Sequence, residues 1–162
     1  MRLTIAAIAK LPRGPEKTLC DDLAARAGTL ARTTSLGPVD MREIEIKNAG
    51  ATRDAIRSAE AKALRAALEG CEKIVALDER GRTLKSVAFS ETLTKWRDQG
   101  VRNAGFLIGG AEGLDPELRE SADLAVSFGA LTWPHALARV MLVEQLYRAA
   151  TIAAGHPYHR EG

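Results

Sequence analysis

The sequence has few of the residues from which reactive sites are usually built. It contains two cysteines and three histidines among its 162 residues. Cys20 and Cys71 lie far apart, and neither stands at a metal-ligand spacing from a histidine. We therefore expect no bound metal. We also expect two inert thiols in a reducing compartment, which favours a cytoplasmic protein.

Several sequence signatures of nucleotide and hydrolase sites are also absent. There is no G-x-G-x-x-G motif for dinucleotides and no G-K-[ST] motif for nucleoside triphosphates. The G-x-S-x-G elbow of serine hydrolases is missing as well. These absences exclude the commonest ways in which an α/β protein of this size binds phosphate or forms an acyl-enzyme.

The chain also lacks long apolar runs and a strong charge of one sign. No run is long enough to cross a membrane, so no membrane association is expected. The short apolar start of the chain is interrupted by Lys10 and by the turn 12–15, and we interpret it as a strand rather than a signal peptide. The net charge is only +2. If RNA is the partner, folding or dimerisation must bring basic side chains together, or the protein must recognise the RNA mainly by its shape.

What is present is an alternation of short apolar runs with amphipathic segments. We predict strands at 3–9, 39–46, 73–77, 104–108 and 124–128. We predict helices at 15–31, 52–69, from Ser86 or Ser90 to about Gly100, at 116–122 and at 134–154. This alternation indicates one α/β domain spanning 1–162, with a mostly parallel sheet flanked by helices.

The segment 106–116 organises this prediction. An apolar strand runs into a loop that contains Gly109, Gly110 and Gly113. Asp115 can cap the next helix, and Pro116 fits its first position. A glycine loop at the carboxyl end of a buried parallel strand is a usual place for a small ligand, although a simple tight turn would give the same pattern.

Two further loops should lie beside this one. Leu77-Asp78 and 128–134 also follow buried strands, and the ends of parallel strands point the same way. The three loops offer mainly backbone groups and apolar side chains, which suit a flat uncharged heterocycle. Asp78 and Glu112 could form a carboxylate pair, but we favour the interpretation that both are solvated loop charges. Residues 78–82 are predicted to form a polar loop.

The last predicted helix is apolar around most of its circumference. A helix of this kind is buried on more than one side, and a partner subunit is the expected second cover. His135 and Arg139 lie on one face, and Glu144 and Arg148 form an i, i+4 pair on the opposite side. For His135, a capping or packing role and a functional role are equally supported.

Several motifs together resemble one known family. They are Leu77-Asp78, the I-G-G-A-E-G-L run ending at Leu114, L-T-W-P-H ending at His135, and H-P-Y-H-R-E at 156–161. The combination is similar to the RlmH family, the pseudouridine N3-methyltransferases of the large ribosomal subunit, within the SPOUT class. The resemblance implies a C-terminal trefoil knot, a homodimer and S-adenosylmethionine as cofactor. The implied cofactor contacts are Leu77, Gly109, Phe128, Gly129, Ala130, Leu131, Thr132 and Trp133.

The same resemblance directs attention to the C-terminal tail as the catalytic element. Terminal segments are often frayed, but we expect this one to be ordered over an active site, its own or the partner's. His159 is the first candidate for the base at N3, and Tyr158 for stacking on the substrate. Arg139 and Arg160 are candidates for contacts with RNA or with the transition state. Alternatives are a dimeric ribosome-binding factor without transfer activity, and a SPOUT enzyme acting on another RNA such as transfer RNA. The absence of an added RNA-binding domain favours assembled ribosomes over free RNA.

Overall fold

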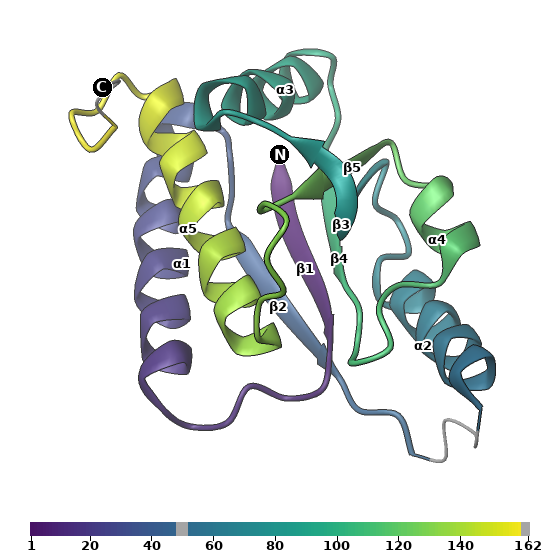
Figure 1. Cartoon of the computed structure of the whole chain (residues 1–162). Helices are drawn as coiled ribbons and strands as arrows, with labels where there is room; N and C mark the ends of the chain where they lie inside the picture. The colour runs from purple at the N-terminus through teal and green to yellow at the C-terminus, as the bar shows by residue number, and fades with distance from the viewer. Residues whose placement is uncertain (48–51, 160–162) are drawn as a thin grey trace.

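A computed structural model describes residues 1–47 and 52–159. Five strands form one sheet in the order β2-β1-β4-β3-β5, and every neighbouring pair is parallel (Figure 1). The strands are β1 (Arg2–Ile8), β2 (Val39–Ile44), β3 (Lys73–Thr83), β4 (Asn103–Ile108) and β5 (Leu124–Ser127). The helices are α1 (Pro15–Thr34), α2 (Arg53–Ala67), α3 (Ser86–Asp98), α4 (Pro116–Glu120) and α5 (His135–Ala153). The predicted α/β fold with a parallel sheet flanked by helices is confirmed.

The helices cover both faces of the sheet, and each face has its own core. Helices α1, α3 and α5 pack on one face, where Phe106 meets Phe89 edge-on with 6.5 Å between the ring centroids. Helices α2 and α4 pack on the other face, where Leu107 lies with Leu64 and Leu118. Phe106 and Leu107 are consecutive in β4 and therefore point to opposite faces. This explains why β4 is a continuous apolar run instead of an alternating one.

The predicted helix caps are confirmed at two helices and wrong at a third. Asp115 accepts a hydrogen bond from the backbone N–H of Leu118 at 3.0 Å, and Thr52 accepts one from Ala55 at 3.2 Å. Helix α3 has neither Ser86 nor Ser90 as its cap, because Lys85 precedes it. The Ser90 hydroxyl instead donates to the carbonyl of Ala149, and the Ser86 hydroxyl donates to Gln145, so both bind α5.

The predicted polar loop 78–82 is also wrong, because β3 continues through it to Thr83. The strand pairs with β5 on both sides of a register shift between Leu77 and Arg82, so residues between them form a bulge. A Cβ atom on Gly81 would lie 2.6 Å from the backbone of Val126, and this close approach accounts for the glycine. The partner strand β5 is far along the chain, so the local polar sequence did not reveal the pairing.

Helix α5 lies between α1 and α3, which accounts within one chain for much of its apolar surface (Figure 1). Its buried residues are Arg139, Leu142, Val143, Leu146, Tyr147, Ala149, Ala150 and Thr151. Leu137, near the start of the helix, is 40% exposed. Among the described residues, no helix is both long and apolar enough to span a bilayer.

Candidate functional site

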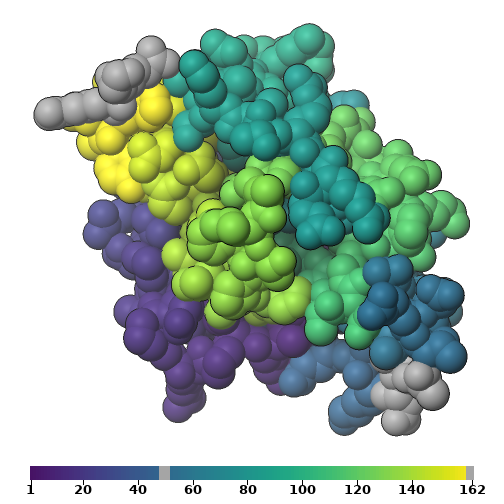
Figure 2. All heavy atoms as spheres, viewed as in Figure 1, coloured from purple at the N-terminus to yellow at the C-terminus, as the bar shows by residue number. Residues whose placement is uncertain are grey.

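A cavity of about 340 Å³ opens at the carboxyl edge of the sheet. Its walls come from the ends of three neighbouring strands, β4, β3 and β5, as the sequence predicted. In Figure 2 the light-green segment after β5 faces the teal outer part of β3 across a recess in the surface. Of the residues expected to hold the cofactor, the lining includes Leu77, Gly109, Phe128, Gly129, Leu131, Thr132 and Trp133. Ala130 is exposed and is not part of the lining.

The glycine loop forms one wall of the cavity by folding back on itself. Gly113 donates its backbone N–H to the carbonyl of Gly110 at 2.9 Å and has a φ of 78°, a conformation that glycine adopts at little cost. A Cβ atom on Gly109 would lie 2.9 Å from the backbone of Gly113 and Leu114. The loop therefore brings bare backbone to the cavity, and a side chain at Gly109 would not fit without a shift of the main chain.

The segment after β5 forms the opposite wall. Ser127 is buried, and its hydroxyl both donates to the carbonyl of Gly129 and accepts the N–H of that residue, each at 3.1 Å. These bonds set a sharp turn at Gly129, where φ is 108°. Beyond the turn Trp133 contacts the carbonyl of Phe128 through its indole N–H at 3.4 Å, while Leu131 is 70% exposed. The turn is therefore fixed from inside the fold, and apolar surface remains at the mouth of the cavity.

Two of the three carboxylates that line the cavity, Asp78 and Glu112, are held by other groups. Asp78 accepts the backbone N–H of Arg80 at 2.9 Å and lies 3.9 Å from Arg119, and its side chain is only 11% exposed. Glu112 pairs with Arg53 at 2.6 Å. Asp78 is therefore not the solvated loop charge that the sequence suggested, since it lies within the bulge of β3.

His135 begins α5 and lines the cavity. Partial burial lowers the pKa of its imidazole, and the nearby positive charge of Arg139 lowers it further. The ring is therefore held neutral near physiological pH. Pro134 stands at the N-cap position before it, and no side chain caps α5.

Within the described residues, the C-terminal tail folds back on α5 as far as His159. Tyr158 donates its hydroxyl to Glu144 at 3.1 Å, and its ring lies 4.8 Å from the guanidinium carbon of Arg148 and 4.8 Å from the ring of Tyr147. Arg148 binds Glu144 and lies 3.5 Å from Nδ1 of His159. We call Glu144, Arg148, Tyr158 and His159 the tail cluster. These contacts hold residues 158 and 159 against α5.

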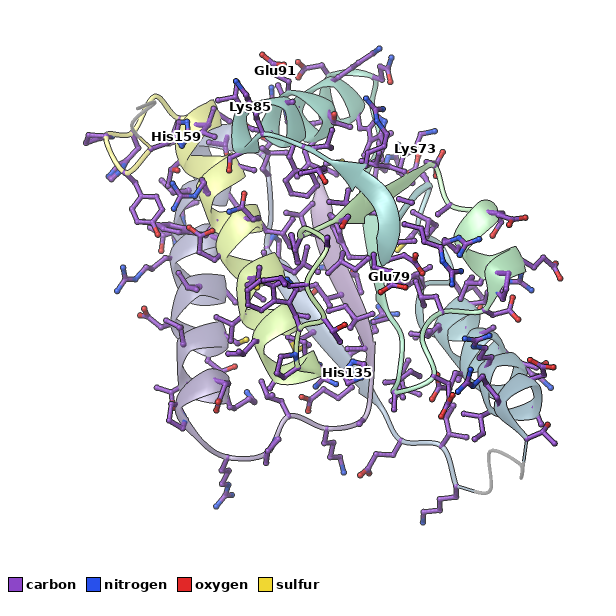
Figure 3. All side chains as sticks on the ribbon, viewed as in Figure 1. Lys73, Glu79, Lys85, Glu91, His135 and His159 are labelled. Carbon is purple, nitrogen blue, oxygen red and sulfur yellow. The ribbon has the colours of Figure 1, made fainter. Side chains whose placement is uncertain are left out.

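The tail cluster lies along the middle and the C-terminal part of α5, and the cavity lies at the N-terminal end of this helix. Figure 3 shows His135 at one end of the helix and His159 beside the other. No residue of the tail cluster lines the cavity, and Glu144, the cluster residue nearest to His135 along the helix, is roughly 14 Å from it along the helix axis. The tail residues and the cavity predicted to form one catalytic site are therefore not brought together within a single chain.

Arg139 belongs to neither group. Its side chain is 2% exposed, and its guanidinium donates to the carbonyls of Ile8 and Ala9 at the end of β1 and approaches Glu43 at 3.4 Å. Burial lowers the pKa of this arginine, while Glu43 opposes the shift. The structure thus gives Arg139 a place inside the fold, and the predicted contact with RNA or the transition state gains no support from it. Arg160 lies outside the described residues.

Arg148 is the residue that sequence reasoning missed. The i, i+4 pair with Glu144 was recognised, and the pair forms with Nε of Arg148 at 2.9 Å from Glu144. The pattern predicts only this pair within the helix, and the contact of Arg148 with the tail does not follow from helical spacing. One feature of the sequence could have predicted the contact: Tyr158 and His159 come so soon after the end of the helix that they can fold back onto its last turns.

The cavity is suited to binding rather than to covalent catalysis. It offers backbone groups and apolar walls, and the hydroxyl of Ser127, the one serine in the lining, is hydrogen-bonded to Gly129 and not to a base. Within residues 1–47 and 52–159, no group of three histidine, cysteine, aspartate or glutamate side chains is arranged to hold a metal. A flat organic ligand with polar edges fits this lining, as the three-loop prediction proposed.

A family model described as "Predicted SPOUT methyltransferase" matches residues 1–159, and the chain belongs to this family. Two relatives narrow the match further, and both are named "Ribosomal RNA large subunit methyltransferase H". The one from Ruegeria pomeroyi is 50% identical over 161 residues, and the one from Caulobacter vibrioides is 49% identical over 161 residues. In each case the match covers 99% of both chains. These relatives confirm the RlmH resemblance.

A solved structure supports the fold at lower identity. A probable methylase family protein from Haemophilus influenzae Rd KW20 superposes with a TM-score of 0.54 and 12% identity, covering 99% of this chain and 70% of the other. This likeness concerns the arrangement of the α/β layers alone. The trefoil knot stays a prediction that the family membership supports.

Proposed function

We propose that this chain is an S-adenosylmethionine-dependent methyltransferase that methylates N3 of a pseudouridine in large-subunit (23S) ribosomal RNA. We further propose that it acts in the cytoplasm on assembled ribosomes. The observation that carries the proposal is the cavity, which gathers seven of the eight cofactor contacts implied by the RlmH resemblance. The name of the full-length relatives supports the class of RNA.

The residues of the cavity fit this cofactor. Leu77 and Phe128 provide apolar walls for an adenine ring, and the backbone of the glycine loop offers hydrogen-bonding groups for its polar edge. Any side chain at Gly109 would displace the main chain of Gly113 and Leu114, so the glycine preserves the shape of this wall. When bound, the cofactor supplies a methyl group on a positively charged sulfonium. In the transfer, a bond forms between the methyl carbon and N3, the carbon–sulfur bond breaks, and the N3 proton leaves to solvent.

The separation of the tail cluster from the cavity supports a homodimer. The described tail residues do not line the cavity of their own chain, and the tail could instead cover the cavity of a second copy. Five large apolar side chains are exposed: Leu19 on α1, Leu131 and Trp133 before α5, Leu137 on α5, and Tyr158 in the tail. Exposed apolar groups of this size are typical of surfaces that bind a partner. We therefore propose a two-fold dimer in which each tail completes the partner's site.

The geometry of the tail cluster indicates what His159 would contribute. A guanidinium has no acceptor, so the contact with Arg148 favours the tautomer in which Nδ1 of His159 accepts and Nε2 carries the proton. Nε2 is buried and has no partner among the described residues. Once the ring turns out of its buried position on binding RNA, Nε2 would donate to a carbonyl beside N3 and stabilise the developing negative charge. The role differs from the base that was our first candidate.

The activity is tested with methyl-tritiated S-adenosylmethionine. Ribosomes from cells that lack this enzyme and free ribosomal RNA are incubated with the purified protein, and the labelled nucleotide is identified. Label in a large-subunit pseudouridine, mainly in assembled ribosomes, is the expected result. Label in free RNA alone would reject the ribosome as substrate. Cofactor binding without label in either would point to another RNA, and the absence of both would favour a binding factor without transfer activity.

The shared site is tested with mixed dimers. One subunit carries Gly109→Arg, which blocks the cavity but leaves the tail intact, and the other lacks residues 156–162 but has an intact cavity. Each homodimer should be inactive. Heterodimers isolated through two different affinity tags should regain about half of the wild-type activity, because one of their two sites has both parts. Inactive heterodimers would show that each tail serves its own subunit.

A further inference from the structure

The glycine loop is held from behind by a buried carboxylate on α2. Glu60 is 8% exposed, and it accepts the backbone N–H of Gly110 at 3.2 Å. Figure 1 shows this helix beside the loop that follows β4. Among the described residues, Glu60 pairs with no lysine or arginine. A buried carboxylate without a cation is costly to a fold, so its presence calls for a specific contact.

The contact with Gly110 is close enough to set the path of the main chain. A Cβ atom on Gly110 would lie 2.3 Å from Oε1 of Glu60, so the carboxylate occupies the space of the missing side chain. The carbonyl of the same glycine accepts the N–H of Gly113 and closes the loop. Glu60 therefore holds the residue on which the loop folds, while Gly109, immediately before it, faces the cavity.

Two arginines on α2 hold the outer part of the same loop. Nε of Arg57 donates to the carbonyl of Glu112 at 2.7 Å, and Arg53 pairs with the Glu112 carboxylate at 2.6 Å. Positions 53, 57 and 60 lie on one face of the helix. Of the three, Glu60 alone is buried, and it alone binds the inner turn of the loop. Burial raises the pKa of its carboxyl, which the N–H of Gly110 partly offsets.

We propose that Glu60 is a positioning residue for methyl transfer, which fixes the backbone of Gly109 and Gly110 in the conformation that receives the cofactor. The inference rests on the proposed function, because it takes the glycine loop as a cofactor wall. Glu60 is not part of the cavity lining and acts through the loop. Without its acceptor, the N–H of Gly110 loses its partner and the loop relaxes toward the space that the carboxylate leaves.

This role predicts a particular kinetic signature. Removing the acceptor should weaken cofactor binding, since the wall must be reordered each time the cofactor binds. The bound complex has the same reacting groups, so kcat at saturating cofactor should stay within about twofold. The KM for RNA should not change. A general loss of folded protein would instead lower kcat and leave both KM values unchanged.

The test uses four forms of the full chain. Glu60→Ala removes the acceptor, Glu60→Asp retracts it by one methylene, and Glu60→Gln keeps an oxygen at the same reach. Glu91→Ala removes an exposed glutamate on α3 and serves as the matched control. S-adenosylmethionine binding is measured by calorimetry, steady-state kinetics are measured on ribosomes, and circular dichroism checks folding.

Loss of one hydrogen bond to a charged group should raise the cofactor Kd and KM about tenfold or more in Glu60→Ala and Glu60→Asp. Glu60→Gln should restore both to within about threefold of wild type, and Glu91→Ala should match wild type. Unchanged cofactor affinity in folded Glu60→Asp would overturn the proposal, as would an equal loss in Glu60→Gln. If wild type itself binds no cofactor, the proposed function fails, and the role of Glu60 fails with it.

Discussion

Replacing Arg139 by methionine separates a structural role for this residue from a role in RNA binding. The variant keeps much of the side-chain volume but removes the guanidinium that joins α5 to the end of β1. It leaves the carbonyls of Ile8 and Ala9 without this donor and Glu43 without its cation. Breaking a buried pair from one side typically costs about 3–5 kcal/mol, because the remaining groups stay buried and unpaired.

That cost converts to a large thermal shift. For a chain of this size each kcal/mol lowers the melting temperature by about 2–4 °C, so Arg139→Met should melt roughly 6–20 °C below wild type. Urea unfolding should show the loss as a lower midpoint with an unchanged slope. Arg139→Lys should fall between the two, because an ammonium cannot reach the two carbonyls and Glu43 together as the planar fork does.

The control is Arg32→Met, which removes an exposed arginine near the end of α1 and should melt as wild type does. A stability change below about 1 kcal/mol in Arg139→Met would refute the structural role, since an internal link cannot be worth so little. If that stable variant also lost ribosome-dependent transfer while still binding cofactor, Arg139 would be the RNA contact that the sequence suggested.

Three further predictions concern the cavity, the tail and the buried carboxylate. Gly109→Arg should abolish cofactor binding, measured by calorimetry, and methyl transfer, because a side chain there meets the main chain of Gly113. Gel filtration should show an unchanged oligomeric state. Retained binding would contradict the loop assignment. Deleting residues 156–162 should leave calorimetric cofactor binding intact and stop label transfer, and transfer at the parental rate would exclude a catalytic tail. Burial raises the folded-state pKa of Glu60, so the protein loses stability as pH rises through that value and Glu60 ionises. Glu60→Gln should therefore gain in melting temperature relative to wild type as pH rises from about 4 to about 8, and a constant difference would contradict this origin.

The sequence predicted best those features that depend on neighbouring residues. The Asp115 cap, the glycine turn after β4 and the apolar runs of the parallel strands are local patterns, and the structure confirms each. The gathering of three loops was also predictable, because parallel strands end at one edge.

The features that were missed depend on distant partners. The outer half of β3 is polar and becomes a strand only because β5 pairs with it. Arg139 stands one helical turn from His135 and looked like a surface cation, but the end of β1 encloses it. Arg148 looked like half of a surface pair until the tail returned to it. In each case the deciding contact comes from a different segment of the chain, so helical or strand periodicity alone did not predict it.

The order of the strands has a consequence for the synthesis of the protein. β1 lies between β2 and β4, and Arg2 pairs with Asn103, so the centre of the sheet stays open until more than half of the chain has been made. The last helix then packs against the first, since α5 lies along α1. Contacts between distant parts of a chain form slowly, because a long loop must close before any of them contributes. A nascent chain should therefore remain without the cavity at the carboxyl edge of its sheet until translation ends. Under the proposed function, a chain could act on a ribosome only after its own synthesis is complete.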